Sequence, residues 1–393
     1  MTERSAVAVG TLYDPFDAGI HLDPYEAYAT LRREYPLYRN EQRDFWALSR
    51  YEDVVRAARD QVRFSASRSV FLEEDGVYGI RDPDWIAGDA PRHAVLHKVM
   101  APHLGPAAGM EPMVRGIASR FVDRAVAGET VDFVEEVARP LPIAVIFELW
   151  GVPESEREEL VKLSDGIWRR EPGVMRLPAE VGDAYRAFRA ALERLTASRR
   201  EHDGILGALS RGRRDGVLSA SEVVDISLLV PVTGFKTTAA LLAATVMQLA
   251  LHPEQQRLVE AGAEGCVEEV LRFDPPVHWL PRVTTTEVML EHGTIPEGER
   301  VLLLLGSANR DEARFRDPDR FDITRRGRRH VAFGFGVHYC VGAVLARLLA
   351  TTFLELLFSR VDRVELCGPV ERIYSSLGER EFARLPVRFQ VRA

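Results

Sequence analysis

Cysteine is scarce in this chain, which has only three cysteines among 393 residues, at positions 266, 340 and 367. Three widely spaced cysteines give no disulfide framework, which excludes the small disulfide-stapled classes and suits a reducing compartment. Basic residues are also in deficit, because 51 Lys and Arg face 59 Asp and Glu and the formal net charge is −8. This balance excludes a general nucleic-acid binder, although it allows a local basic face.

Long apolar runs, linkers and repeats are absent as well. No stretch offers the eighteen or more uninterrupted apolar residues of a membrane span, and residues 1–17 have neither a basic region nor an apolar run. No Pro/Gly/Ser-rich linker or low-complexity run divides the chain, so we expect one domain over residues 1–393. The sequence therefore predicts a soluble, cytoplasmic protein without a membrane partner, and its 46% hydrophobic content is enough for a sizeable core.

One of the three cysteines stands in an unusual setting. Residues 332–342 read Ala-Phe-Gly-Phe-Gly-Val-His-Tyr-Cys-Val-Gly, so three glycines bracket Cys340. Residues without a Cβ suit a tight loop whose backbone approaches a flat ligand closely while amide N–H groups point at a sulfur. An apolar helix is expected over residues 341–358, and its N-terminus would favour a thiolate. We interpret Cys340 as the thiolate ligand of a haem iron, because the other two cysteines have no comparable surroundings.

This loop resembles the haem-binding signature of the cytochrome P450 enzymes. The match is Phe-Gly-x-Gly-x-His-x-Cys-x-Gly, starting at Phe333, continued by Gly-x-x-Leu-Ala-Arg from Gly342 to Arg347. It carries several fixed positions, and companion motifs follow in the family's order over nearly the whole chain. The resemblance implies a mainly α fold with small β-sheets (α+β), triangular in outline, and haem b as the cofactor. It places Phe333, Gly334 and Gly342 in the haem loop, with Cys340 as the metal ligand.

Four other side chains match positions at which the family binds the haem propionates. Arg282 and His338 correspond to two propionate ligands, and cationic or donor groups on a carboxylate make physical sense. The family usually has His-x-x-x-Arg on an earlier helix; here His93 fits and His97 replaces the Arg. Since a histidine is charged only part of the time near neutral pH, anchoring on this side would be weaker, or be completed by Lys98.

A long apolar helix is expected over residues 219–251, with a helix-capping pattern at its start and a kink or widened turn near Pro231. Part of it resembles the family's Ala-Gly-x-(Glu/Asp)-Thr, in which the acid and the Thr deliver protons to bound dioxygen. Gly234 and Thr237 match, whereas Lys236 takes the place of the acid. An unshifted Lys stays cationic and accepts protons poorly, so the usual relay is in doubt.

Three interpretations of Lys236 are open. Its ammonium can face solvent or an acidic neighbour while Thr237 and water suffice for proton delivery. It can instead pair with an acidic substrate. Or the enzyme uses a pre-oxidised substrate or peroxide, so that proton delivery matters less.

The helix that ends near residue 273 carries Glu-x-x-Arg. Glu269 and Arg272 are i and i+3, and by themselves would be an ordinary surface ion pair. They resemble the family's buried Glu-x-x-Arg pair, and Arg320 matches the third member of that triad. We expect all three to have a structural role and no catalytic one.

The resemblance also suggests residues on the substrate side. Residues 64–88 are expected to form a loop that covers the substrate, and residues 375–381 a tip that enters the pocket. Residues 154–200, two long helices around a Pro/Gly break, resemble the family's mobile lid. The candidate substrate contacts are Arg68, as an anion-binding group, with Val232, Thr233, Val277 and Leu280.

Periodicity predicts the remaining elements. Helices are expected over residues 23–33, 51–59, 89–98, 110–127, 135–150, 154–168 and then to residue 200; strands near residue 38 and over 45–48, 301–305, 361–366 and 387–391; and a hairpin over 283–299.

Electrons, if used, must come from other proteins, because no Gly-x-Gly-x-x-Gly follows an expected strand. The resemblance implies a ferredoxin and a ferredoxin reductase. A run of arginines precedes the cysteine loop, at Arg325, Arg326, Arg328 and Arg329. It is either a solvated charge run or, with Lys98, a patch that steers an acidic electron donor.

The function expected is a haem-thiolate monooxygenase that acts on a small or medium organic molecule as a monomer. The C-terminal half looks closest to members that hydroxylate or O-demethylate aromatic acids, but the long helix lacks their polar carboxylate-binding residues. Natural-product tailoring, that is, secondary metabolism, is the broader expectation. A haem-thiolate enzyme for ring closure, coupling, group transfer or peroxide use is the alternative motivated by Lys236. A haem sensor without turnover is a third hypothesis, against which Thr237 counts.

Overall fold

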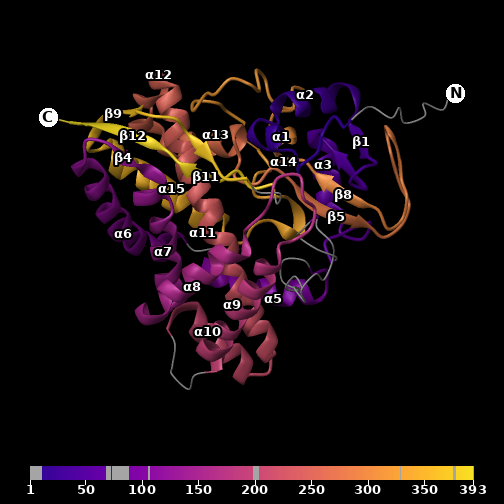
Figure 1. The fold of residues 1–393 in the computed structure, drawn as a ribbon, viewed down its shortest axis with the longest axis horizontal. Helices are drawn as coiled ribbons and strands as arrows, with labels where there is room; N and C mark the ends of the chain where they lie inside the picture. Colours follow the sequence, from indigo (N-terminus) through magenta and orange to yellow (C-terminus); the bar gives the residue numbers. More distant parts are fainter. Residues whose placement is uncertain are drawn as a thin grey trace.

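Helices make up most of the fold, and α11 (Ala220–Leu251) runs through its middle (Figure 1). The computed structural model describes residues 11–67, 72, 88–104, 107–197, 203–327, 329–374 and 378–392, without the side chains of residues 107, 108 and 229–232. Ser219 caps α11, since its side chain accepts from the N–H of Glu222 while the Glu222 carboxylate accepts from the N–H of Ser219. This capping box confirms the helix start that the sequence predicts.

The other helical segments described are α1 (Ala18–Leu22), α2 (Tyr25–Glu34), α3 (Tyr51–Arg59), α5 (Arg92–Leu104), α6 (Ala107–Ala127), the π-helix η2 (Val134–Ala138), α7 (Pro140–Trp150), α8 (Glu154–Ile167), α9 (Ala179–Ala197), α10 (Gly204–Arg214), α12 (Pro253–Gln256), α13 (Val259–Phe273), α14 (Leu305–Ala308), the 3₁₀ turn η3 (Gly336–His338) and α15 (Ala343–Phe358).

Strands gather in small sheets beside this helical mass (Figure 1). The largest has the order β1-β2-β8-β5-β3, built from Leu37–Asn40, Phe45–Leu48, Arg300–Leu303, Leu280–Thr284 and Phe64–Ser65. A second has the order β4-β12-β9, from Val131–Asp132, Pro386–Val391 and Val361–Leu366. Two hairpins are β6-β7 (Val288–Leu290 and Gly293–Ile295) and β10-β11 (Glu371–Arg372 and Phe382–Arg384). Only β2 and β8 pair in parallel among these described strands.

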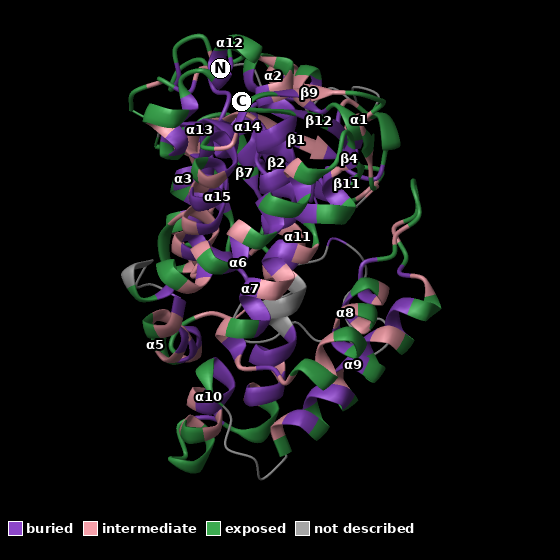
Figure 2. Ribbon diagram, turned by 90° about the vertical axis from the view of Figure 1, so that its left-hand side faces the viewer, coloured by how far each residue is buried: buried purple, intermediate pink, exposed green. Residues whose placement is uncertain are grey.

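The main hydrophobic core surrounds α11, which packs against α7, α9, α13 and β9. Figure 2 shows buried residues along α11 and exposed residues on the outward faces of α8, α9 and α10. By length and apolar composition alone α11 could cross a membrane, yet 64% of its most apolar window is buried inside the fold. Its apolar character is therefore explained by its central place in the core.

Most of the predicted elements are present, and the differences concern where helices are interrupted and one helix that was not predicted. The segment predicted as one helix over 135–150 is a π-helix followed by α7, and α10 was not predicted. The helix α11 continues across Pro231 and Gly234 without the predicted widened turn. At Gly234 the reason for a missing side chain is a close helix crossing, because an added Cβ would lie 2.7 Å from Cδ1 of Ile146 on α7.

Candidate active site

The cysteine loop turns tightly just before α15 and is fixed at both of its ends. The N–H of Cys340 donates to the carbonyl of Phe333 at 2.9 Å, which closes the loop. Gly334 and Gly336 have φ of 73° and 77°, the left-handed region in which glycine is favoured. A Cβ on Gly336 would lie 2.7 Å from the carbonyl oxygen of Ala58, so the loop is pressed against the end of α3. The glycines therefore serve backbone geometry, as their pattern predicts.

Cys340 stands just before α15, and the residue is exposed although protein atoms crowd its sulfur. Burial raises the pKa of the Cys340 thiol, while N–H groups of Gly342 and Ala343 and the charge of Arg347 act in the opposite direction. The helix N-terminus does favour the thiolate, as predicted, but burial has the larger effect in the protein alone. A metal cation at the sulfur would reverse this order, because a coordinated thiol is deprotonated.

A cluster of one arginine and three histidines lies at the same loop. The His338 and His93 rings lie 4.3 Å apart between centroids, and His97 lies 5.9 Å from His93. Arg282 is buried, and its guanidinium donates to the carbonyl of Pro281 at 2.6 Å. The predicted group of Arg282, His338, His93 and His97 is thus brought together by β5, η3 and α5.

This cluster is short of negative charge. Burial, Arg282 and then His93 lower the pKa of His338 to about 3, and burial lowers the pKa of Arg282 to about 10. Nε2 of His338 is buried without a hydrogen-bond partner. Asp89, the nearby carboxylate, already accepts from the Ser65 hydroxyl and from the N–H of Ala66. A ligand that carries carboxylates would relieve the mutual repulsion and satisfy the orphaned nitrogen.

A second charged group, which the sequence analysis missed, lies beside the cysteine loop. Glu268 accepts from Nε of Arg347 at 2.6 Å and contacts Nε2 of His330 at 3.2 Å. These contacts lower the pKa of Glu268 to about 2 despite burial. The guanidinium of Arg347 lies 4.5 Å from the Phe333 ring centroid and donates to the Tyr339 hydroxyl. Arg347, known from the motif, is therefore held against the cysteine loop by Glu268.

Thr237 lies half-buried on α11. Its hydroxyl donates to the carbonyl of Thr233 at 2.6 Å, four residues earlier. This bond occupies the hydroxyl proton and leaves the oxygen lone pairs able to accept a hydrogen bond. Thr237 is thus oriented by Thr233, another of the predicted residues.

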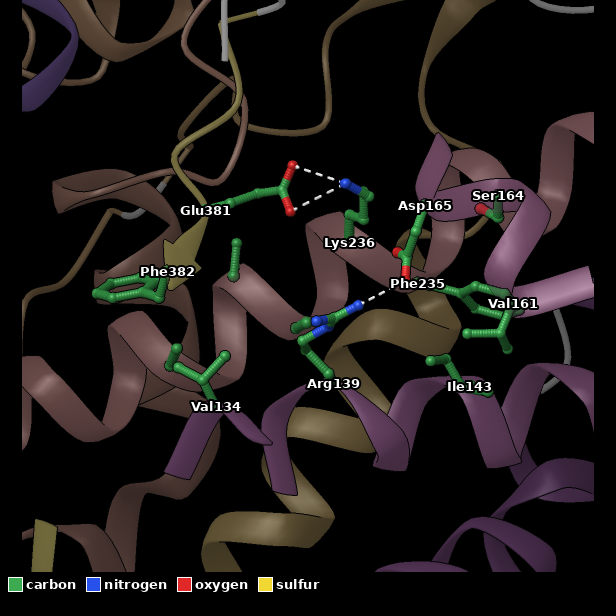
Figure 3. A pocket seen from close by; sticks show the side chains of 13 residues that line it. Val134, Arg139, Ile143, Val161, Ser164, Asp165, Phe235, Lys236, Glu381 and Phe382 are labelled. Carbon is green, nitrogen blue, oxygen red and sulfur yellow. Dashed lines mark hydrogen bonds and ion pairs between the residues drawn. The ribbon is translucent and has the colours of Figure 1, made fainter. Parts of the chain in front are cut away.

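Lys236 points to an acidic neighbour. Its Nζ lies 3.3 Å from Oε2 and 3.4 Å from Oε1 of Glu381, just before β11, as Figure 3 shows. The ammonium also lies 5.2 Å from the Trp168 ring centroid. The first of the three interpretations, an acidic neighbour, agrees with this pair. Glu381 and Trp168 were not singled out from the sequence.

A hollow of about 490 Å³, partly open to solvent, lies beside this ion pair. Lys236 and Glu381 line one part of it, and the salt bridge between Arg139 and Asp165 lines another (Figure 3). The rest of the wall is mostly apolar and comes from η2, α7, α8, α11 and β11, with Ser164 as a polar member. Cys340, Arg282 and the clustered histidines do not line this hollow.

The predicted structural triad is correct in two of its members. Arg272 holds the buried Glu269 carboxylate with Nη2 at 2.8 Å and Nε at 2.9 Å. The third side chain is Arg325, whose Nε lies 3.1 Å from Oε1 of Glu269; the prediction of Arg320 was wrong. The Arg320 side chain is exposed, and only its carbonyl takes part, accepting from Arg272 and Arg325. A sequence match cannot separate side-chain from backbone participation.

The predicted substrate contacts are only partly placed. Leu280 lies near the cysteine loop, since a Cβ on Gly334 would be 3.4 Å from its Cδ1. Val277 forms an isolated antiparallel bridge with Glu379. Arg68 and the side chain of Val232 lie outside the described residues, as does Arg328 of the basic run. Of that run, Arg326 and Arg329 are exposed, like Lys98.

Comparison with known proteins places the chain among relatives of the same length. A family model described as Cytochrome P450 matches residues 263–392. The chain is 38% identical over 391 residues to a putative cytochrome P450 123 of Mycobacterium tuberculosis, across 96% of this chain and 97% of that protein. The chain belongs to the cytochrome P450 family.

This P450 is also 32% identical over 360 residues to the cyclomarin C epoxidase CymV of Salinispora arenicola, which covers 88% of this chain and 91% of that protein. Among solved structures, the cytochrome P450 CYP109Q5 from Chondromyces apiculatus matches with a TM-score of 0.84 and 32% identity, over 97% of this chain and 98% of that one. The predicted α+β class is confirmed. The protein is an oxidoreductase of the monooxygenase type with haem iron as its cofactor.

Proposed function

We propose that this P450 inserts one oxygen atom from O2 into a small or medium organic substrate, by hydroxylation, O-demethylation or a similar reaction. The setting would be bacterial natural-product or aromatic metabolism. The observation that carries the proposal is the glycine-shaped Cys340 loop beside Arg282 and a group of histidines whose buried His338 nitrogen lacks a hydrogen-bond partner. A relative named as an epoxidase supports an oxygen-inserting reaction.

The residues present fit haem b, whose ring is flat and whose two propionates are anionic. Cys340 would hold the haem iron through its sulfur, and Phe333, Gly334 and Gly342 would shape the loop around it. His338, Arg282 and His93 would bind the propionates, with His97 as a weaker neighbour. When bound, the haem would supply dioxygen activation, in which one oxygen atom enters the substrate and the other leaves as water after uptake of two electrons and two protons.

The chain's own residues would orient the reactants and manage protons. Thr237 would accept a hydrogen bond in the active-site cavity, because its own proton is held by the Thr233 carbonyl. Val277, Leu280 and Thr233 would contact the substrate, together with Arg68 and Val232. Gly234 would let α7 approach α11 closely enough to close the cavity.

The partners would be a ferredoxin and its reductase. Exposed Arg326, Arg329 and Lys98 would offer a positive face to an acidic donor in a protein whose net charge is negative. The protein would act as one cytochrome P450 domain over residues 1–393, as a monomer in the cytoplasm.

Reconstitution with haem, a ferredoxin, its reductase and isotopic dioxygen tests the proposal. Label in the product of a natural-product or aromatic panel would support it. Product without label would favour the alternative reaction class, such as ring closure or peroxide use. Product absent across the whole panel would favour a haem sensor.

Two further measurements check the cofactor and the substrate class. Cys340→Ser should lose the thiolate-type absorption of the reduced carbon monoxide complex, and its retention would refute the axial ligand. Titration of the ferric protein with aromatic acids and their neutral amides shows whether a cation such as Arg68 selects the substrate. Spectral shifts with acids alone are the result expected for that role.

A further inference from the structure

Two acidic side chains on the C-terminal tip point to the same side of an extended segment. Glu379 and Glu381 are two residues apart, with exposed fractions of 7% and 9%, and the intervening Arg380 turns away to donate to Asp274 at 2.9 Å. Alternation of this kind is the ordinary geometry of an extended chain. The tip therefore directs two buried carboxyl groups toward α11, where Lys236 meets Glu381.

The surroundings of Glu379 favour its protonated form. Burial first, and the neighbouring Glu381 second, raise the pKa of Glu379 to about 8. Lys236 and Arg170 act in the opposite direction, but more weakly than burial. Oε2 of Glu379 is buried and has no hydrogen-bond partner. A neutral carboxyl group with an unsatisfied oxygen is costly to bury, and such groups are found where they serve a function.

The charge on Glu379 affects the ion pair between Lys236 and Glu381. With Glu379 protonated, the cluster holds one carboxylate, on Glu381, and one ammonium, on Lys236, and these two form the ion pair. If Glu379 gives up its proton, the second negative charge lies beside the same ammonium and near Arg170. Cationic neighbours make the loss of the proton from Glu379 easier.

The cluster lies between the hollow and the segment that leads into β5. On one side, Lys236 and Glu381 line the hollow that also contacts the surface salt bridge of Arg139 and Asp165, whose side chains are half exposed. On the other, Glu379 bridges Val277, which precedes the strand whose Leu280 lies next to the cysteine loop. Directly opposite residues of an antiparallel pair place their side chains on the same face. The side chains of Glu379 and Val277 therefore lie next to each other.

We propose that Glu379, Glu381 and Lys236 form a proton-exchanging site, loaded from water in this hollow, that supplies protons to the active-site cavity. The inference rests on the proposed monooxygenase reaction, which consumes protons. It assigns to the C-terminal tip the carboxyl group that α11 lacks at Lys236. Glu379 and Glu381 are positioning residues in this account, because they act through water or the Thr237 hydroxyl.

The proton balance is simple. The O–H proton of Glu379 passes to water in the cavity, or through water to Thr237, and leaves a carboxylate that Lys236 stabilises. The carboxylate regains a proton from hydronium that enters by the hollow, relayed by Glu381. No electron moves in either step, and the cluster returns to its starting charge.

A purely structural role is the competing explanation, because the ion pair also ties the tip to α11. The test therefore uses infrared spectra of the ferric haem-loaded protein, which detect the carbonyl stretch of a protonated carboxyl group. The variants are Glu379→Gln and Glu381→Gln, with Glu371→Gln as the matched control. Glu371 lies on the same hairpin, is exposed and is paired with Arg384.

The wild type and Glu371→Gln should show a carboxyl band that disappears as pH rises through about 8, and Glu379→Gln should lack it. In ferredoxin-driven turnover, Glu379→Gln should lower product per NADPH about a hundredfold and release the difference as peroxide, since a positioned proton donor contributes roughly 10²- to 10⁴-fold. An unchanged band in Glu379→Gln, or unchanged coupling, would overturn the proposal. An equal loss of product per NADPH in Glu371→Gln would also overturn the proposal, because that result would indicate a general defect of the hairpin.

Failure of this inference is distinguishable from failure of the proposed function. If isotopic oxygen enters product in the wild type and Glu379→Gln remains fully coupled, only the proton site is wrong. If no label enters product in any variant while the carboxyl band still titrates, the proton-exchanging group exists and the monooxygenase reaction is wrong.

Discussion

The Nε atom of Arg325 lies 3.1 Å from Oε1 of Glu269, a carboxylate that Arg272 holds from its other side. All three groups are buried or nearly so, and the same Arg325 guanidinium donates to the carbonyls of Arg316, Asp317 and Arg320. The segment just before the cysteine loop is therefore fastened to α13 by one side chain.

Removal of that side chain should destabilise the fold. Arg325→Ala leaves a buried carboxylate with one guanidinium instead of two and removes one donor from each of three carbonyls, so we expect a loss of about 3 kcal/mol in the free energy of unfolding. Urea denaturation of the haem-loaded protein measures it. Arg320→Ala is the matched control, and should stay within about 0.5 kcal/mol because only its backbone carbonyl is used. A larger loss for Arg320→Ala would reverse the assignment.

His97 offers a prediction about cofactor retention. Replacement by Arg places a permanent cation with a planar fork of donors beside His93. We expect His97→Arg to slow haem release roughly fivefold, the equivalent of one added charge-assisted hydrogen bond of about 1 kcal/mol. Transfer of haem to an excess of apomyoglobin measures the rate.

The same substitution should have the opposite effect on the protein without haem. His97 already lowers the pKa of His93 and of His338, so a stronger cation would increase repulsion within the cluster. The haem-free His97→Arg variant should therefore unfold at a lower urea concentration than the haem-free wild type. Faster haem release from the variant would contradict the propionate role of this position.

Substitutions on the two sides of Glu379 should move its pKa in opposite directions. Lys236 lowers the pKa of Glu379 and Glu381 raises it, so Lys236→Met should raise that pKa and Glu381→Gln should lower it. The carboxyl band in infrared titrations provides the reading. Lys236→Arg keeps the charge and should leave the pKa close to the wild-type value. Shifts of the same sign in Lys236→Met and Glu381→Gln would show that the three groups do not interact as described.

The stability of the protein should depend on pH through Glu379. Its pKa is about 8 in the folded protein and near the ordinary 4.5 when unfolded, so the folded state binds the extra proton between these values. Stability contributed by this proton is complete below about pH 4.5 and is lost as pH rises through about 8. The difference in unfolding free energy between wild type and Glu379→Gln should therefore fall with pH over this range. A flat difference would contradict the buried, protonated carboxyl group.

The sequence predicted the elements with strong local signals. The capping box at Ser219, the strands β2 and β9 and the helix α3 follow from residues next to one another. The haem loop was recognisable because its glycines, His338 and Cys340 are close together in the chain. The grouping of Arg282, His93 and His338, by contrast, rested on the family resemblance alone, since three separate elements bring them together.

The errors arose where long-range contacts decide. Arg325 and Arg320 lie five residues apart, and only the fold determines which guanidinium turns toward Glu269. Glu379 and Glu381 carry no motif, and their burial against Lys236 depends on how the tip meets α11. Gly234 lacks a side chain because Ile146 comes close, a packing reason that a helix-propensity argument does not contain.

The parallel pairing of Trp46 with Val301 and of Leu48 with Leu303 sets an order of events during synthesis. The hairpin β1-β2 leaves the ribosome early, but its inner edge has no partner until residues beyond 303 have emerged. Until then its unpaired N–H and C=O groups can bind a strand from a neighbouring nascent chain. Yield in a recombinant host should therefore depend on translation speed and on chaperones that shield this edge.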